Sequence, residues 1–384
     1  MNTSAYPSTK IVGNEGKLFY IDNIRIILTI LVILHHTCVM YGAPGGWYYK
    51  EPTMLKAALI PMTVLVSTDQ SFFMGFFFFI SAAFTYSSLK RKGWRRFLTD
   101  RLIRLGLPLI FYSFVFSPFL IFLIYRYGEN NHASFFQFLG GFHDWIDFGV
   151  LWFVAALLLF TVVCVALHRT FDKMRIGLFA VPKLKVILCS ALLIGLISFI
   201  IRIPFPVGWV LHPLGFQPGH FTQYIFLFIM GIIAAKNDWL KQFSENNFQQ
   251  FWRTIKILLC FFPVFFLIQT GFHLPMVWYS GGFNVLSLLY SAWEQCIGFC
   301  IISAMLIFGK QHWNFSTPTV SFLSQHAFAV YIFHPLALIS IALLLRPWSA
   351  DPGFKLLIAA PIGVAGSILL AILVRLIPSV KRII

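Results

Sequence analysis

The chain has 384 residues, of which 59% are hydrophobic and only 11% are charged, and its mean hydropathy is +0.80. Soluble domains carry about 25% charged residues, so the composition excludes a soluble domain. It predicts a protein that crosses a membrane several times. The formal net charge of +16 does not indicate nucleic acid as a partner, because there is no soluble domain to display a basic face. All six cysteines lie in apolar runs, so no disulfide framework is expected.

The chain begins with a polar tail, residues 1–20, that lacks the basic start and small-residue cleavage site of a signal peptide. Ten apolar runs of spanning length follow, near residues 21–42, 70–89, 105–125, 150–168, 186–201, 222–235, 255–270, 284–308, 327–345 and 354–377. The run 55–66 is too short to span and contains Pro61, which places it in an outer loop or at the membrane interface. Residues 21–384 show no repeat or linker, so a single transmembrane domain is expected.

The basic residues predict the orientation of this bundle. If the N-terminus is cytoplasmic, most of the 29 lysines and arginines fall on the cytoplasmic side, as the positive-inside rule requires. An even number of spans then returns the C-terminus to the same side. The sequence therefore predicts an all-α membrane protein, a bundle of about ten transmembrane helices with both termini cytoplasmic.

The first span carries a polar stripe. Arg25 and His36 are eleven positions apart, so on a helix they fall within ~20° of each other and ~16 Å apart along the axis. Asp22 and Thr29 lie near the same face, whereas His35 lies on another side. Aligned polar groups in a membrane span usually face a cavity or the bundle interior. The alternative is that Arg25 snorkels to the headgroups and that His36 is a satisfied core histidine.

Arg25, ten intervening residues and His36 resemble the Arg/Lys-X10-His signature in the first span of the acyltransferase-3 family of integral membrane O-acyltransferases. Segments along most of the chain are similar to later family segments: 72–112, 149–160, 219–240 and 329–338. The chain departs from the family in one segment: it reads Ser81-Ala82-Ala83-Phe84 where the family commonly has Ser-Gly-Phe, so it lacks the flexible glycine. The resemblance implies a multi-pass protein of the plasma membrane, which in a bacterium is the inner membrane.

The resemblance also implies transfer of an acyl group, acetyl or succinyl, from cytoplasmic acyl-CoA to a hydroxyl of an extracytoplasmic glycan or similar acceptor. Acyl-CoA is then a co-substrate, and neither a bound cofactor nor a metal is expected. A sugar hydroxyl needs a base to take its proton as it attacks the thioester. A buried neutral imidazole suits that task, so His36 is the predicted base. Glu294, near mid-membrane in the eighth run, is the candidate partner for the protonated imidazole, unless it only bridges helices.

The phosphates of acyl-CoA predict cationic contacts at the inner face, because arginine binds phosphate bidentately. Besides Arg25, the family pattern favours Arg101 and Arg104 at the entrance to the third span, although headgroup anchoring explains them as well. Ser81 and His334 are further candidate contacts for acyl-CoA. We place His334 in the inner half of the ninth span, where a core histidine beside a proline kink is the simpler account.

The outer loops supply aromatic and histidine side chains that suit a sugar acceptor. Trp47, Tyr48, His143 and His220 lie on segments shaped by glycine and proline and are the candidate acceptor-binding residues. Aromatic belts at the membrane interface are an ordinary alternative explanation.

Two other classes of protein remain open at this point. A bundle with Arg25, His36 and Glu294 in its interior can relay protons, as in a proton-coupled transporter or an exporter of a lipid-linked saccharide. The sequence shows no inverted halves that would favour a transporter. A bis-histidine haem protein would need histidines on facing helices at one depth.

Overall fold

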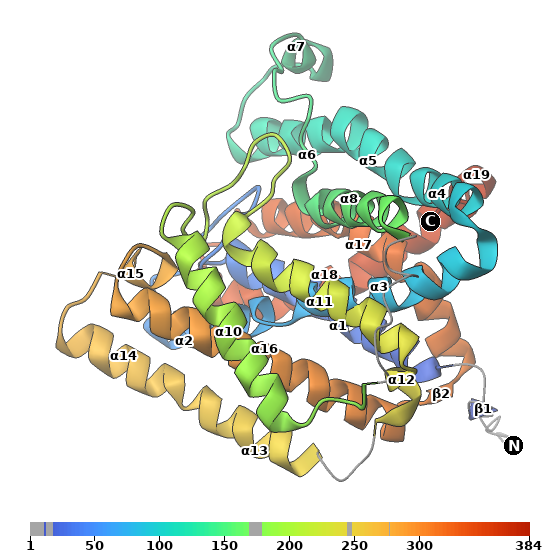
Figure 1. Cartoon of the computed structure of the whole chain (residues 1–384). Helices are drawn as coiled ribbons and strands as arrows, with labels where there is room; N and C mark the ends of the chain where they lie inside the picture. The colour runs from blue at the N-terminus through green and yellow to red at the C-terminus, as the bar shows by residue number, and fades with distance from the viewer. Residues whose placement is uncertain (1–10, 13–17, 169–178, 244–247, 276) are drawn as a thin grey trace, which may run out of the picture.

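The computed structural model describes residues 11–12, 18–168, 179–243, 248–275 and 277–384. The predicted polar tail, residues 1–20, lies outside the described residues except for 11–12 and 18–20. The described part contains ten helical segments that are long and apolar enough to cross a membrane, arranged as one bundle (Figure 1). This confirms the predicted all-α membrane bundle, while the side on which the termini lie stays a prediction.

The first half of the bundle contains α1 (Phe19–Met40), α2 (Lys56–Gln70), α3 (Phe73–Lys92), α4 (Trp94–Arg101), α5 (Leu107–Phe111), α6 (Ser117–Leu123), α7 (Phe135–Gly140) and α8 (Trp152–Ala166). The second half contains α10 (Leu184–Arg202), α11 (Pro218–Lys236), α12 (Trp239–Gln242), α13 (Phe248–Leu259), α14 (Phe261–Gly271), α15 (Val277–Ser280), α16 (Val285–His312), α17 (Pro318–Leu345), α18 (Pro352–Arg375) and α19 (Pro378–Lys381). Two short antiparallel strands, β1 (Ile11–Val12) and β2 (Phe315–Ser316), pair Ile11 with Ser316 and Val12 with Phe315.

The third span is a continuous helical segment, Trp94–Gly128, in which α4, α5 and α6 alternate with wider π-helical turns. These turns are Leu102–Gly106, Tyr112–Phe116 and Ile124–Gly128. Pro108 and Pro118 each follow one of them. Proline has no N–H for the preceding turn, and a wider turn lets the helix continue past it.

The sequence predicts segment 55–66 to lie in an outer loop or at the membrane interface; the segment is not a loop, because it forms most of the helix α2. Met62, Val66 and Asp69 are the buried residues of α2, and their spacing of four and three puts them on one helical face. That face packs against α1, α3 and α16. Pro61 lies inside α2, at its sixth residue, so the helix continues past a residue that supplies no backbone N–H.

α1 is the central helix of the bundle and packs against α2, α3, α16, α17 and α18. The helices α3 and α11 approach each other very closely, and a Cβ atom at Gly231 would lie 2.3 Å from the carbonyl oxygen of Phe79. Small residues permit such close backbone approach between membrane helices. The surroundings of α1 are therefore fixed by tight packing on several sides.

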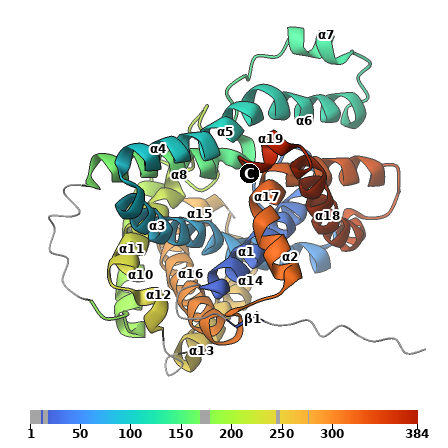
Figure 2. The same ribbon diagram turned by 90° about the vertical axis from the view of Figure 1, so that its right-hand side faces the viewer.

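Contacts between distant segments define the two ends of the bundle. At one end, Tyr20 Oη donates to the Leu240 carbonyl (2.7 Å) and Asn23 Nδ2 donates to the Phe315 carbonyl (2.9 Å). At the other end, Thr53 Oγ1 donates to Asp351 Oδ1 (2.5 Å). Figure 1 places β1, α12 and α19 at the first end and α15 at the second. Figures 1 and 2 both show α7 projecting from the bundle.

Candidate functional site

His35 and His36 lie near the end of α1, and the helix turns their rings toward different neighbours. The His35 ring stacks on Phe73 of α3, with 4.9 Å between ring centroids. The His36 ring faces Trp47 and His334 instead. This is the difference in direction that the 100° step between adjacent helical residues predicts.

His36, Trp47 and His334 form a group of three rings in mutual contact. The ring centroids of His36 lie 4.3 Å from Trp47 and 5.3 Å from His334, with interplanar angles of 23° and 16°. Trp47 and His334 are 5.9 Å apart. The prediction that His334 lies in the inner half of its span is wrong, because α17 begins at Pro318, well before the predicted start. His334 therefore lies at the depth of His36.

The three rings carry polar atoms that are not satisfied by the protein. His334 Nδ1 is 2.7 Å from the Tyr331 carbonyl, so this nitrogen carries the proton and Nε2 carries the lone pair. Among the described residues, His36 Nδ1, His334 Nε2 and Trp47 Nε1 are buried without a hydrogen-bond partner. Buried polar atoms are nearly always paired, so an unpaired acceptor beside an unpaired N–H donor is typical of a site that awaits a ligand.

The loop between α1 and α2 places Trp47 over His36 because both of its ends are tied down. The Glu51 N–H donates to the Met40 carbonyl (2.9 Å), which folds the loop back over α1. The side chain of Lys355 on α18 pairs with Glu51, and Lys355 is only 1% exposed. This clasp between the loop and the last span fixes the position of Trp47.

Tyr48 extends the group toward α8. Its hydroxyl is 2.7 Å from that of Tyr112. A Cβ atom at Gly149 would lie 1.8 Å from the Tyr48 hydroxyl, so only glycine leaves room for the phenol. Burial raises the pKa of Tyr48 above its usual value. The phenol therefore remains protonated.

Asp69 on α2 is a carboxylate that the sequence analysis did not identify. Its Oδ2 atom lies 4.0 Å from His35 Nδ1, and the two side chains are 7% and 8% exposed. Within the described part of the chain, neither atom has a hydrogen-bond partner. The sequence does show an acidic residue between the apolar runs 55–66 and 70–89. That residue is expected inside the membrane only if the two runs are treated as one membrane-spanning element.

Glu294 is buried on α16, and its partners Arg202 and His220 are on α10 and α11. Arg202 Nη2 forms an ion pair with Glu294 Oε2, and His220 Nδ1 lies 3.5 Å from Oε1. Gln295 Nε2 donates to the same carboxylate at 3.2 Å. Within the described residues, Glu294 forms no ion pair or hydrogen bond with His36, its predicted partner.

Arg202 is the second residue that sequence reasoning missed, because it ends the fifth apolar run and was counted with the outer loop. It is fully buried, and it donates to the Gly219 carbonyl (3.0 Å) and to Ser291 Oγ (3.1 Å). A polar chain continues from Gln295 to Gln223 (2.8 Å) and from Gln223 to the Ser71 carbonyl (2.8 Å). A band of hydrogen-bonded polar groups thus crosses the bundle from Arg202 to Ser71, and within the described residues Glu294 Oε1 is its atom without a hydrogen-bond partner.

The structure brings the predicted arginines together at the first end of the bundle. Arg25 lies 3.6 Å from Asp22. Arg101 donates to Thr85 Oγ1 (3.4 Å) and covers the ring of Phe97. The charge of Arg104 acts on both Arg25 and Arg101. Ser81 is on α3, one turn before Thr85.

The two remaining acceptor candidates lie elsewhere. His143 is exposed and follows α7, where it lines a hollow together with Tyr125 and Asp144. His220 is buried in the Arg202 and Glu294 cluster rather than displayed on an outer loop. Of the four acceptor candidates, Trp47 contacts His36, and Tyr48 contacts Trp47 with 5.3 Å between ring centroids.

Comparisons with known proteins identify the family of the chain. Residues 18–376 match the family described as "Acyltransferase domain". The chain is 24% identical over 336 residues to "Glucans biosynthesis protein C" of Escherichia coli O81 (strain ED1a) and to the protein of the same name from Shigella dysenteriae serotype 1 (strain Sd197). Each match covers 83% of this chain and 82% of the relative. No solved structure matches.

The family match extends from the start of α1 to the end of α18 and so includes the histidines, the arginine cluster and all ten spans. The chain belongs to the acyltransferase-3 family and is a multi-pass acyltransferase of the plasma membrane.

Proposed function

We propose that the protein transfers an acyl group, acetyl or succinyl, from cytoplasmic acyl-CoA to a hydroxyl of an extracytoplasmic glycan or similar acceptor, with His36 as the general base. The observation that carries the proposal is the contact of His36 with Trp47 and His334, in which buried ring nitrogens lack partners. A group that must exchange a proton with a substrate needs such a free nitrogen.

The reaction needs no other reactant. His36 accepts the proton of the acceptor hydroxyl as the oxygen attacks the thioester carbonyl. The tetrahedral intermediate then breaks the carbon–sulfur bond, and the imidazolium returns the proton to the departing sulfur. An ester and CoA thiol result, and His36 is neutral again.

Trp47 has a proposed role in the same step. The tetrahedral intermediate carries a negative oxygen, and a fixed N–H donor in a site without water stabilises such an oxygen strongly. The buried Nε1–H of Trp47 has no partner among the described residues, and the indole ring lies against His36. Trp47 therefore serves as oxyanion donor besides contacting the acceptor.

Asp69 is the proposed acidic partner that stabilises the positive charge formed on His36. The ring of His35 lies between the two, 5.4 Å from the His36 ring and within 4.0 Å of the Asp69 carboxylate. Glu294 has Arg202 as its counter-charge, so Asp69 is the better candidate for this task. An opposite charge nearby favours the imidazolium.

Arg25, Arg101 and Arg104 are proposed to bind the phosphates of acyl-CoA. Arg25 lies ~16 Å from His36 along the axis of α1, and acyl-CoA has an extended arm between its nucleotide and its thioester. Within the described residues, the ion pair of these three arginines is that of Arg25 with Asp22, while Asp100 pairs with Lys92, so positive charge is left for phosphate. His334 and Ser81 are proposed contacts along the path of the arm.

The proposal is tested by turnover of labelled donors. The purified protein in vesicles is incubated with radiolabelled acetyl-CoA or succinyl-CoA and a glycan acceptor, and the label in the glycan is counted. Transfer of either acyl group supports the proposal. Turnover of neither donor, with uptake of a saccharide into the same vesicles, favours the transporter.

The sides of the membrane are tested separately. Single cysteines at Lys92 and His143, in a background without native cysteines, are treated in intact cells with an impermeant maleimide. Labelling at position 143 and not at 92 is expected. Labelling at 92 alone would reverse the orientation and with it the donor side.

A further inference from the structure

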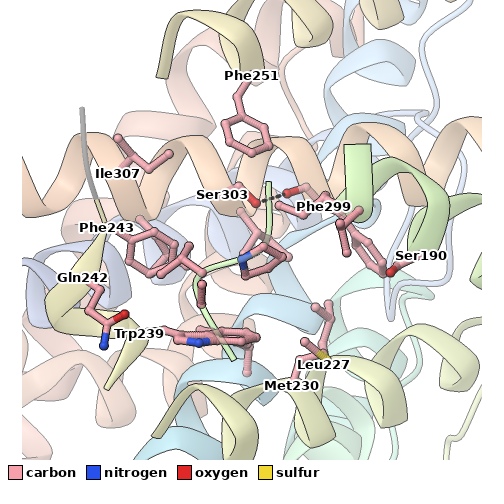
Figure 3. Close-up of a pocket in the computed structure, with 18 of the residues that line it drawn as sticks. Ser190, Leu227, Met230, Trp239, Gln242, Phe243, Phe251, Phe299, Ser303 and Ile307 are labelled. Carbon is pink, nitrogen blue, oxygen red and sulfur yellow. Dashed lines mark hydrogen bonds between the residues drawn. The ribbon is translucent and has the colours of Figure 1, made fainter. Parts of the chain in front are cut away.

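A second cavity, of about 330 Å³, lies between α10, α11, α12, α13 and α16. It is lined mainly by aromatic and aliphatic side chains (Figure 3). Trp239 and Phe243 of the α12 region, Phe251 of α13 and Phe299 of α16 make up much of its wall. None of the histidines or arginines of the proposed reaction is among its lining residues, so the cavity is separate from the reaction site.

Three polar side chains of the cavity wall, those of Trp239, Gln242 and Ser303, donate hydrogen bonds within the protein. Trp239 Nε1 donates to the Phe179 carbonyl (2.7 Å), and Gln242 Nε2 donates to the Asn237 carbonyl (2.9 Å). Ser303 Oγ donates to the carbonyl of Phe299 (2.8 Å), the interaction drawn in Figure 3. A ligand in the cavity therefore finds these three donors already engaged in hydrogen bonds and contacts mainly apolar side chains. Such a cavity suits a hydrocarbon chain rather than a polar molecule.

The cavity lies near the first end of the bundle, at the level of the membrane boundary. Lys310 Nζ donates to the Phe243 carbonyl (2.9 Å), and Tyr20 Oη donates to the Leu240 carbonyl (2.7 Å). These bonds hold the α12 region beside the ends of α1 and α16. The wall residues Met230 and Phe226 lie about two and three turns from the end of α11, ~9 and ~15 Å along its axis, which is the depth of the acyl chains in that leaflet.

Three lysines are next to lining residues of the cavity in the sequence. Lys183 and Lys185 lie between the lining residues Pro182 and Val186 in the sequence, and both lysines are exposed. Lys241 precedes the lining residue Gln242 and is exposed as well, 3.3 Å from Asp238. Basic side chains beside an apolar cavity at a membrane boundary match an anionic headgroup with its chain buried.

We propose that this cavity binds one acyl chain of an anionic phospholipid of the same leaflet, with the phosphate held among Lys183, Lys185 and Lys241. The lipid fills the space between the α10 and α13 side of the bundle and the wall formed by α11 and α16. This site is independent of the acyl transfer, since it shares no residue with it.

The test compares lipid retention by the full-length protein. The protein is reconstituted with equal amounts of phosphatidylglycerol and phosphatidylcholine, extracted in mild detergent, and analysed by native mass spectrometry. One phosphatidylglycerol per chain is expected to remain. Ser303→Phe, which fills the cavity, should lose this lipid, whereas Ser321→Phe on the exposed surface of α17 should keep it. Replacement of the three lysines by glutamine should lower the preference for phosphatidylglycerol by about fivefold per lysine.

A second measurement does not depend on how the Ser303 variant folds. Phosphatidylglycerol with brominated chains should quench tryptophan fluorescence in the unaltered protein, and part of that quenching should disappear in Trp239→Phe. Equal retention of both lipids by the unaltered protein, unchanged retention in a folded Ser303→Phe protein, or identical quenching with and without Trp239 would overturn the proposal.

Discussion

Replacing His36 and His35 one at a time tests the proposed base with an internal control. The two histidines share a helix, a depth and a residue type, and they differ in what their rings contact: Trp47 and His334 for His36, Phe73 for His35. Loss of a general base typically costs 10²- to 10⁴-fold in rate, which is about 3–5 kcal/mol of barrier. His36→Ala should show a loss of this size.

His35→Ala should act on stability more than on rate. It removes an aromatic contact with Phe73, worth ~0.5–1.5 kcal/mol, and the 4.0 Å approach to Asp69, but it leaves the free nitrogens of the His36 group and the Asp69 carboxyl in place. A third variant, His36→Phe, keeps a ring beside Trp47 but has no nitrogen, so it separates the proton transfer from the packing. It should be as inactive as His36→Ala.

The assay is transfer of labelled acyl groups in membranes with protein amounts matched by immunoblot. Near-normal activity of His36→Phe would show that the ring matters only as packing. Activity lost in His35→Ala and kept in His36→Ala would refute both the helical-face reasoning and the assignment of the base.

Three further predictions concern other residues of the site. Trp47→Phe keeps an aromatic ring on His36 but loses the N–H, so kcat should fall about 10²-fold; unchanged kcat would leave Trp47 with acceptor stacking alone. Arg25→Lys keeps the charge but loses bidentate phosphate binding, so the apparent affinity for acyl-CoA should weaken while membrane insertion is unchanged; equal affinity would return Arg25 to an anchoring role. Arg202→Leu leaves the buried Glu294 without its guanidinium counter-charge, and thermal unfolding in detergent should show a loss of ~3–5 kcal/mol that the Arg202→Leu/Glu294→Leu double variant largely restores. Full transfer activity in that double variant would remove Glu294 from the catalytic residues.

The spans were predictable from the sequence because the solvent dictates them. A backbone in hydrocarbon must satisfy its own hydrogen bonds, so each long apolar run has to be a helix. α2 escaped this reasoning because its run is short and contains Pro61, and because Asp69 interrupts the apolar pattern before α3. Burial of Asp69 depends on neighbouring helices, which a scan of single runs does not include.

The site was predictable only along α1. The direction of His36 relative to His35 follows from helical geometry, whereas the arrival of Trp47 depends on a loop held by Lys355, which lies some 300 positions later in the chain. In the same way, Glu294 was recognisable as an expensive intramembrane carboxylate. Its partner Arg202 was not, because the end of an apolar run does not show on which side of the membrane boundary a side chain will lie.

The buried pair of Arg202 and Glu294 also constrains how the chain is made. The two residues are 92 positions apart, and a membrane protein is synthesised and inserted from its N-terminus. α10 therefore enters the bilayer with an arginine whose counter-charge has not yet been synthesised. Until α16 arrives, the end of α10 has to remain near water, where a charge costs little. The fifth span thus reaches its final depth only when the eighth is in place, and ribosome-stalled chains that end before α16 should leave Arg202 accessible to solvent.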